Sequence, residues 1–184
     1  MRLTGYWDYT TLPKNIRIDS DCFLERFDAF NRFRSERCPG LVLGDRVRVM
    51  TWTTFNVEPT GLVMVGADTL LIGAVFMCAD AIRIGSRCVV SYNVTIADCD
   101  FHPIELEARR RDAIAAGNRS DRPPPVTQPV QIGDDVRIGT GAIILNGVQI
   151  GDRATVAPGA VVACSIPANS LAIGNPAVVT EQSP

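Results

Sequence analysis

Hydrophobic residues recur at every sixth position along the second half of the chain. From residue 132 the series reads Ile132, Ile138, Ile144, Ile150, Val156 and Val162. The residue after each of these anchors is small in five of six cases, and the residue four places after it is always apolar. A period of six fits neither the 3.6 of a helix nor the alternation of a plain strand. It is typical of a short strand followed by a tight turn, repeated many times.

The same register continues toward the N-terminus. Earlier members of the series are Ile72, Cys78, Ile84, Val90 and Ile96. Weaker copies lie at Leu43-Gly44 and, one residue out of phase, at Val65-Gly66. β-Branched anchors suit an extended backbone, and small residues suit turns that need a positive φ or a close approach. Three such units would close one coil of a parallel β-helix, so we predict an all-β column of hexapeptide repeats. A β-sandwich is disfavoured, because its strands do not keep a fixed spacing.

Residues 103–129 interrupt the repeat without shifting its phase. We therefore interpret them as one long excursion loop that leaves an intact column. Residues 104–116 carry Glu105–Arg109 and Glu107–Arg111 pairs four positions apart and stop at Gly117, which predicts a short helix. Residues 120–129 contain three consecutive prolines and must be extended. Long loops on rigid scaffolds are often functional.

The first 40 residues leave two interpretations open. Residues 21–37 could form an amphipathic helix that carries four phenylalanines. The alternative, which we favour, is an irregular first coil that continues the pattern through Ile18 and Leu24. The chain then divides into an N-terminal coil or cap (1–40), a β-helix (41–179) and a short tail (180–184).

Composition narrows the class of protein. The 184 residues carry a formal charge of -2, so no basic footprint for nucleic acid or an anionic membrane is expected. No apolar stretch approaches the roughly 20 residues that span a bilayer, and the N-terminus lacks the apolar core of a signal peptide, so we expect a cytoplasmic protein. The six cysteines form no C-x-x-C pair, and we expect them to be buried in a reducing compartment.

His102 is the only histidine, which excludes, within one chain, a metal site built from several imidazoles. It lies where the last strand before the excursion should end. An unperturbed imidazole is well suited to accept a hydroxyl proton near neutral pH, so His102 is the candidate general base. Asp98 and Asp100 are candidates to orient it, although turn chemistry explains both aspartates and a backbone carbonyl would orient the ring equally well.

Three elements carry a resemblance to a known family. They are the hexapeptide repeats, the sequence Asp98-Cys99-Asp100-Phe101-His102-Pro103, and the C-terminal Gly174-Asn175-Pro176-Ala177. Over residues 40–179 the chain resembles the hexapeptide-repeat acyltransferases. The resemblance implies a left-handed β-helix, acetyl-CoA as acyl donor, no metal, and a homotrimer with active sites between subunits. It points to the sugar O-acetyltransferase branch, which serves surface-polysaccharide biosynthesis, with His102 as base in a direct transfer.

The resemblance also assigns roles to individual positions. The backbone N–H of Thr140 would stabilise the oxyanion, and small residues would let the pantetheine arm pass. The coenzyme contacts implied are Gly139, Thr140, Gly141, Pro158, Gly159, Ala163, Gly174, Asn175 and Pro176. Candidate contacts to the acceptor are Tyr92, Asn93 and Asp98. The arginines at 109–111 could line the acceptor pocket or form a solvated face.

Several positions depart from the family pattern. Arg137 stands where many relatives have tryptophan, and Cys164 stands where many have a basic residue. Val178 and Glu181 follow the Gly-Asn-Pro-Ala segment, where basic residues usually meet the coenzyme phosphates. Arg137, Arg153 or an arginine of another subunit would have to replace them.

Other functions share this fold. The acceptor could be the amine of a nucleotide-linked amino sugar, or an antibiotic. A γ-class carbonic anhydrase needs three histidines and is close to excluded. A non-catalytic β-helical scaffold is the alternative from another class, and the missing basic residues favour it.

Overall fold

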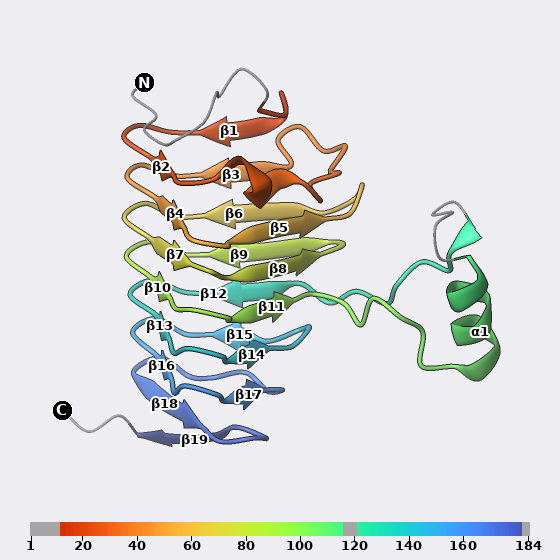
Figure 1. Cartoon of the computed structure of the whole chain (residues 1–184). Coiled ribbons are helices and arrows are strands. Elements are labelled where there is room, and N and C mark those ends of the chain that lie inside the picture. Colours follow the sequence, from red (N-terminus) through yellow and green to blue (C-terminus); the bar gives the residue numbers. More distant parts are fainter. Residues whose placement is uncertain (1–11, 116–120, 182–184) are drawn as a thin grey trace.

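The computed structural model describes residues 12–115 and 121–181. The predictions for residues 1–11, for Gly117 and Ser120, and for the tail at 182–184 lie outside the described residues. The chain forms a left-handed parallel β-helix, as predicted, with three sheets running the length of the column (Figure 1). In the described part of the chain, no helix is long and apolar enough to cross a membrane.

Each of the three sheets collects one strand from successive coils. Sheet 1 contains β1 (Ile16–Ile18), β3 (Leu41–Leu43), β6 (Leu62–Val65), β9 (Ala81–Ile84), β12 (Val130–Ile132) and β15 (Gln149–Ile150). Sheet 2 contains β2 (Phe23–Leu24), β4 (Arg48–Met50), β7 (Leu70–Ile72), β10 (Val89–Val90), β13 (Arg137–Ile138), β16 (Thr155–Val156), β18 (Ser170–Ile173) and the antiparallel β19 (Val178–Glu181). Sheet 3 contains β5 (Thr54–Val57), β8 (Val75–Cys78), β11 (Thr95–Ala97), β14 (Ile143–Ile144) and β17 (Val161–Val162).

From Ile84 onward the six-residue series forms the core of the column. The prediction is wrong at Ile72, which is half-buried, because Leu71 points inward and pairs with the buried Val90. Ile96 pairs with Ile144, which pairs with Val162, and all three are fully buried. The equivalent stacks in the other sheets, such as Ile132 on Ile150, are buried as well. Each six-residue repeat thus carries the chain from one sheet to the next. Each anchor residue adds its side chain to a continuous apolar core.

The small residue after each anchor of sheet 1 is explained by a close approach. A Cβ added to Gly85 would lie 2.5 Å from the carbonyl oxygen of Gly133 in the next coil, and one added to Gly151 would lie 2.4 Å from the backbone N of Ala168. Neither glycine has a positive φ. Of the two reasons the sequence left open, the contact between coils is therefore the one that applies here.

The N-terminal residues form the first coil. β1 and β2 pair with β3 and β4, and only a single 3-10 turn, η2 (Phe27–Phe30), lies within the segment that an amphipathic helix would have occupied. Phe30 stacks on Phe55 with ring centroids 5.7 Å apart, and Phe55 stacks on Phe76 at 4.9 Å. Phe30 thus extends the core and Phe33 packs against it, whereas Phe27 is exposed.

The excursion leaves a continuous column, as the unbroken register predicts. β11 pairs with β8 and β14, and β12 pairs with β9 and β15, so the coils on both sides stay stacked. The helix α1 (Leu106–Ile114) stands away from the column (Figure 1). It begins two residues later than predicted, because the Glu105 carboxylate accepts hydrogen bonds from the N–H groups of Glu107 and Ala108 and caps the helix.

The prediction of buried cysteines is correct for four positions and wrong for two. Cys38 and Cys164 are exposed, whereas Cys22, Cys78, Cys88 and Cys99 are buried. Cys164 lies in a turn between the inward positions Val162 and Ile166, so its side chain is outside the core register. Burial raises the pKa of the Cys88 thiol to about 11, which makes that thiol inert at neutral pH.

Candidate active site

The His102 imidazole belongs to a network that ties the excursion together. Its Nδ1 lies 2.6 Å from Oδ2 of Asp112 on α1. The other carboxylate oxygen of Asp112 accepts a hydrogen bond of 2.6 Å from Nε of Arg122. A terminal nitrogen of Arg122 donates to the carbonyl oxygen of Phe101 at 3.1 Å. Three side chains spaced ten residues apart therefore connect the outgoing arm, the helix and the returning arm.

The partner of Nδ1 decides which nitrogen of His102 is available. The hydrogen bonds from Arg122 and His102 lower the pKa of the Asp112 carboxyl, so it is ionised at neutral pH. An ionised carboxylate only accepts hydrogen bonds, so in the neutral ring Nδ1 carries the proton and Nε2 has the free lone pair. The Asp112 side chain is 5% exposed and that of His102 is 69% exposed. The ring is thus held on one side and open on the other.

The backbone around His102 aims the ring out of the column. Phe101 adopts a left-handed conformation with φ 55°, and the His102 N–H donates to the carbonyl oxygen of Asp100 at 2.6 Å. At the base of the excursion, Cys99 forms an antiparallel bridge with Thr127. The Gln128 N–H donates to the backbone carbonyl oxygen of Asp98. These bonds bring the two arms together, so the path of the excursion is fixed at its root.

Asp98 does not orient the histidine. Its side chain is fully buried, and its carboxylate accepts hydrogen bonds of 2.8 Å from the N–H groups of both Ala79 and Asp80. Both oxygens therefore hold a turn of the preceding coil. The buried carboxylate is also inaccessible to a substrate molecule. The turn interpretation of Asp98 is the correct one.

The side chain of Asp100 also turns away from the imidazole. Its Oδ1 accepts a hydrogen bond of 3.3 Å from the side-chain amide of Asn146, and only its backbone carbonyl contacts His102. The carboxylate that contacts the ring is that of Asp112. The aspartate that contacts the ring thus follows the histidine in the sequence, whereas the two candidates precede it.

Asp112 and Arg122 are the functional residues that the sequence interpretation missed. One signal for Asp112 was present in the sequence. An acidic residue in the last turn of a helix opposes the helix dipole, and such a position calls for a compensating partner. The pairing of Asp112 with Arg122 depends on the three-dimensional path of the excursion, and spacing alone does not reveal it.

The predicted coenzyme residues other than Ala163 lie along one edge of the column, between sheets 2 and 3. Their stacking is shown by bonds from Gly141 N–H to the Tyr92 carbonyl and from Gly159 N–H to the Thr140 carbonyl. The turn containing Gly174 continues this edge through a bond from the Val161 N–H. A Cβ added to Gly141 or Gly159 would meet no atom within 4 Å, so this edge is open to the outside.

Thr140 presents two polar groups at this edge. Its hydroxyl lies 2.9 Å from that of Ser91. Among residues 12–115 and 121–181, its backbone N–H has no acceptor. That N–H is therefore available to a ligand, as an oxyanion donor must be.

One chain does not bring this edge to His102. Gly141 precedes β14, whereas Asn146, the partner of Asp100, follows it. Five residues of extended chain cover about 16 Å at roughly 3.3 Å per residue. Tyr92 and Asn93 lie on the Gly141 side, and Ala163 lies on the side of Asn146. The predicted site residues thus form two groups at opposite ends of the strands of sheet 3.

The arginines considered for the coenzyme phosphates differ in their contacts. Nε of Arg153 donates to the side-chain oxygen of Asn169 at 2.7 Å. Arg137 is exposed on β13, and no ion pair within the described residues engages it. The arginines at 109–111 are exposed on α1, and Arg110 pairs there with Glu107 at 3.3 Å. Their arrangement agrees with a solvated face.

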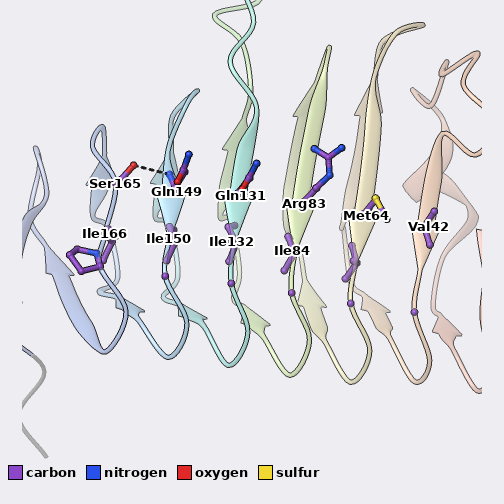
Figure 2. A pocket seen from close by; sticks show the side chains of 17 residues that line it. Val42, Met64, Arg83, Ile84, Gln131, Ile132, Gln149, Ile150, Ser165 and Ile166 are labelled. Carbon is purple, nitrogen blue, oxygen red and sulfur yellow. Dashed lines mark hydrogen bonds between the residues drawn. The ribbon is translucent and has the colours of Figure 1, made fainter.

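Two grooves of similar volume cross the surface. One of about 820 Å³ runs over sheet 1, where Met64, Arg83, Gln131 and Gln149 project side by side and the Gln149 N–H donates to Ser165 at 3.1 Å (Figure 2). Arg83 is the only charged residue that lines it, so this groove offers no acid or base. The second, of about 840 Å³, lies under the returning arm of the excursion and includes Phe101 and Arg122.

Comparison with known proteins places this geometry in context. Residues 129–164 match the family described as bacterial transferase hexapeptide (six repeats). A putative acetyltransferase of Dictyostelium discoideum is 42% identical over 112 residues, which are 61% of this chain and 53% of that protein. The chain thus spans about half the length of the curated relative that it matches.

Two solved structures share the fold and part of the sequence. A maltose O-acetyltransferase of Clostridium difficile 630 is 30% identical, with a TM-score of 0.60, over 76% of this chain and 67% of that one. A hexapeptide-repeat acetyltransferase of Vibrio cholerae O1 biovar eltor, solved with acetyl coenzyme A, is 25% identical with a TM-score of 0.61. That match covers 79% of this chain and 72% of the other.

Proposed function

Because the chain belongs to the hexapeptide-repeat acyltransferase family, we propose that it transfers an acetyl group from acetyl-CoA to a sugar hydroxyl, with His102 as general base. The observation that carries the proposal is the pairing of His102 with Asp112. It leaves Nε2 unprotonated on an exposed ring, which is the arrangement that proton abstraction requires.

The transfer follows from the protonation state of the ring. Nε2 accepts the hydroxyl proton while the acceptor oxygen attacks the thioester carbonyl. The Thr140 N–H donates to the oxyanion that develops there. When the intermediate collapses, the C–S bond breaks and the imidazolium returns its proton to the thiolate of coenzyme A. Asp112 stabilises the imidazolium during this interval, so it is a positioning residue in this scheme.

A homotrimer would unite the two halves of the site. The edge with Thr140 and Gly141 lies about 16 Å from the His102 side within one chain, which exceeds the reach of a reacting group. In a trimer with sites between subunits, the edge of one chain faces the histidine of the next. The open space at Gly141 and Gly159 fits the passage of a pantetheine arm. Arg137 is the described arginine that remains available for the phosphates.

The setting we propose is cytoplasmic modification of a surface-polysaccharide precursor. A specific observation favours O-acetylation over N-acetylation. A free amine needs little help from a base, whereas a hydroxyl needs the oriented imidazole that this chain provides.

The decisive experiment measures the release of coenzyme A thiol from acetyl-CoA with a panel of neutral and charged sugars that includes maltose. We expect His102→Ala to lower kcat by roughly 100-fold or more. Its melting temperature should stay near that of the wild type, because the side chain is exposed. Equal rates in both proteins would contradict the proposed role of the histidine.

Thermal shift with coenzyme A tests the scaffold alternative. A ligand at 100 times its Kd stabilises a protein by about 2.7 kcal/mol, so a functional site should give a clear shift. The absence of a shift at millimolar coenzyme A would favour a non-catalytic scaffold.

A further inference from the structure

The groove of about 840 Å³ under the returning arm, which we call the proline groove, adjoins the histidine network. Two of its lining residues, Phe101 and Arg122, are bonded to each other within that network. One wall is the run Pro123–Pro125, and the opposite side comes from the turns that contain Glu58 and Asp80. These turns belong to coils that precede β11, whereas the coenzyme edge belongs mainly to coils that follow it. His102 therefore lies between the two along the axis of the column.

The proline wall of the groove has a restricted backbone and offers no backbone donors. Prolines have a fixed φ and no backbone N–H, so the wall at 123–125 presents ring faces and carbonyl groups. On the other side, the Thr60 hydroxyl is committed to the carbonyl of Ala79 at 2.6 Å. Such a surface suits the apolar faces of sugar rings better than it suits groups that need hydrogen-bond donors.

The charged side chains of the groove are predominantly acidic. Glu36, Glu58 and Asp80 line it together with Arg37 and Arg122. Arg122 is paired with the carboxylate of Asp112, so its charge is largely compensated outside the groove. Arg37 donates to the backbone carbonyl of Asp80 at 3.2 Å and not to its carboxylate.

The Asp80 carboxylate is the distinctive feature of the lining. It is half-buried, and no group among residues 12–115 and 121–181 donates a hydrogen bond to it. The neighbouring Asp98 carboxylate, by contrast, is fully used by backbone N–H groups. A carboxylate with reduced access to water and no internal donor gains from a cationic ligand.

We propose that the proline groove binds the acceptor and selects one that carries a protonated amine beside the reacting hydroxyl, as an amino sugar does. This inference rests on the proposed acetyl transfer and narrows its substrate class. An amine held as an ammonium by Asp80 has no lone pair and does not attack the thioester. The hydroxyl near His102 remains the nucleophile. Acceptors with carboxylates or phosphates meet like charges in the groove and are disfavoured.

Ligand-observed NMR titrations test the preference without requiring turnover. The probes are disaccharides of glucosamine, glucose and glucuronic acid, at a slightly acidic pH where the amine is protonated. We expect the affinity to fall in that order, with steps of roughly fivefold at low salt and smaller steps at high salt. Asp80→Asn should reduce the preference for glucosamine over glucose. Glu107→Gln is the matched control, because that carboxylate is exposed on α1 outside the groove.

Each outcome has a defined meaning. Equal affinities for the three sugars, or a glucosamine preference that survives in Asp80→Asn, would overturn the inference. A preference that weakens in Asp80→Asn and persists in Glu107→Gln supports it. If that pattern appears but no acetyl group is transferred from acetyl-CoA, the acceptor groove stands and the proposed function fails.

Discussion

The repeating column and the excursion are held together by different physics. In the column, the anchors are aliphatic, fully buried and spaced by six, and neighbouring coils fix one another through parallel ladders. In the excursion, the contacts that set its shape are those of His102, Asp112 and Arg122, all of them polar. The comparison teaches that the apolar packing of the column and the polar network of His102 are separate, so substitutions in the two regions should affect different measurements.

The largest effect is expected in the column. Ile144→Ala removes a fully buried side chain between Ile96 and Val162, and should lower the free energy of unfolding by roughly 2–5 kcal/mol in urea titrations. The adjacent Ile143 is 37% exposed on the outer face, so Ile143→Ala is the matched control and should cost clearly less. Similar losses in the two variants would show that the column is not held by its inward register.

Asp112→Asn tests the excursion, where we expect a loss of activity with little loss of stability. The amide cannot pair with both Arg122 and His102 as the carboxylate does, so we expect kcat to fall about tenfold. The midpoint of urea unfolding should barely change, because α1 lies outside the column. Asp112→Glu should recover part of the rate. A large loss of stability without loss of kcat would contradict the distinction between a stabilising column and an excursion that affects activity.

Gly141→Ala sharpens the comparison at the edge of the column. The added methyl group meets no atom of the chain, but it enters the space proposed for the pantetheine arm. We expect KM for acetyl-CoA to rise about fivefold. Gly73 also has a positive φ and lies on the same edge nearer the N-terminus, so Gly73→Ala carries similar backbone strain. An equal rise in KM for the control would assign the effect to strain.

The smallest effect concerns pH. The pKa of Asp112 is lowered in the folded chain, so its contribution to holding the excursion is present at neutral pH. It is lost only as the pH falls through that lowered pKa, on the acidic side of the ordinary aspartate range. Pepsin should therefore begin to cut the excursion below this pH, while the column resists. Asp112→Asn should be cut at higher pH as well, and cleavage that is independent of this carboxylate would contradict the assignment.

The column could be predicted from the sequence because each coil repeats the same local solution. The anchors from Ile84 to Val162, the unbroken phase across residues 103–129 and the helix within the excursion all follow from spacing. At Ile72 the spacing predicts the wrong residue, because Leu71 is the one that points inward and pairs with Val90. His102 was identifiable because a single residue type and a short motif coincide there. The first coil was harder, since its phenylalanines fit a helical pattern and a β pattern equally well.

The acidic partner of the histidine could not be predicted in the same way. Asp98 and Asp100 are neighbours of His102 in sequence, but alternation and turn geometry send their carboxylates to Ala79 and Asn146. Asp112 reaches the ring only because the excursion folds back on itself. The exposure of Cys38 and Cys164 also depends on turns that lie outside the periodic register. Position within a repeat is encoded locally, whereas contacts across a loop are not.

The two arms of the excursion are joined at its base, so the excursion is attached to the column at a single place. Because the bridge between Cys99 and Thr127 joins the two arms at the column wall, the segment between them starts and ends at neighbouring points. Doubling the length of such a loop costs only about 0.6 kcal/mol in closure entropy. A chain built this way can exchange one excursion for another, and with it the acceptor it handles, while the coils above and below keep their stacking.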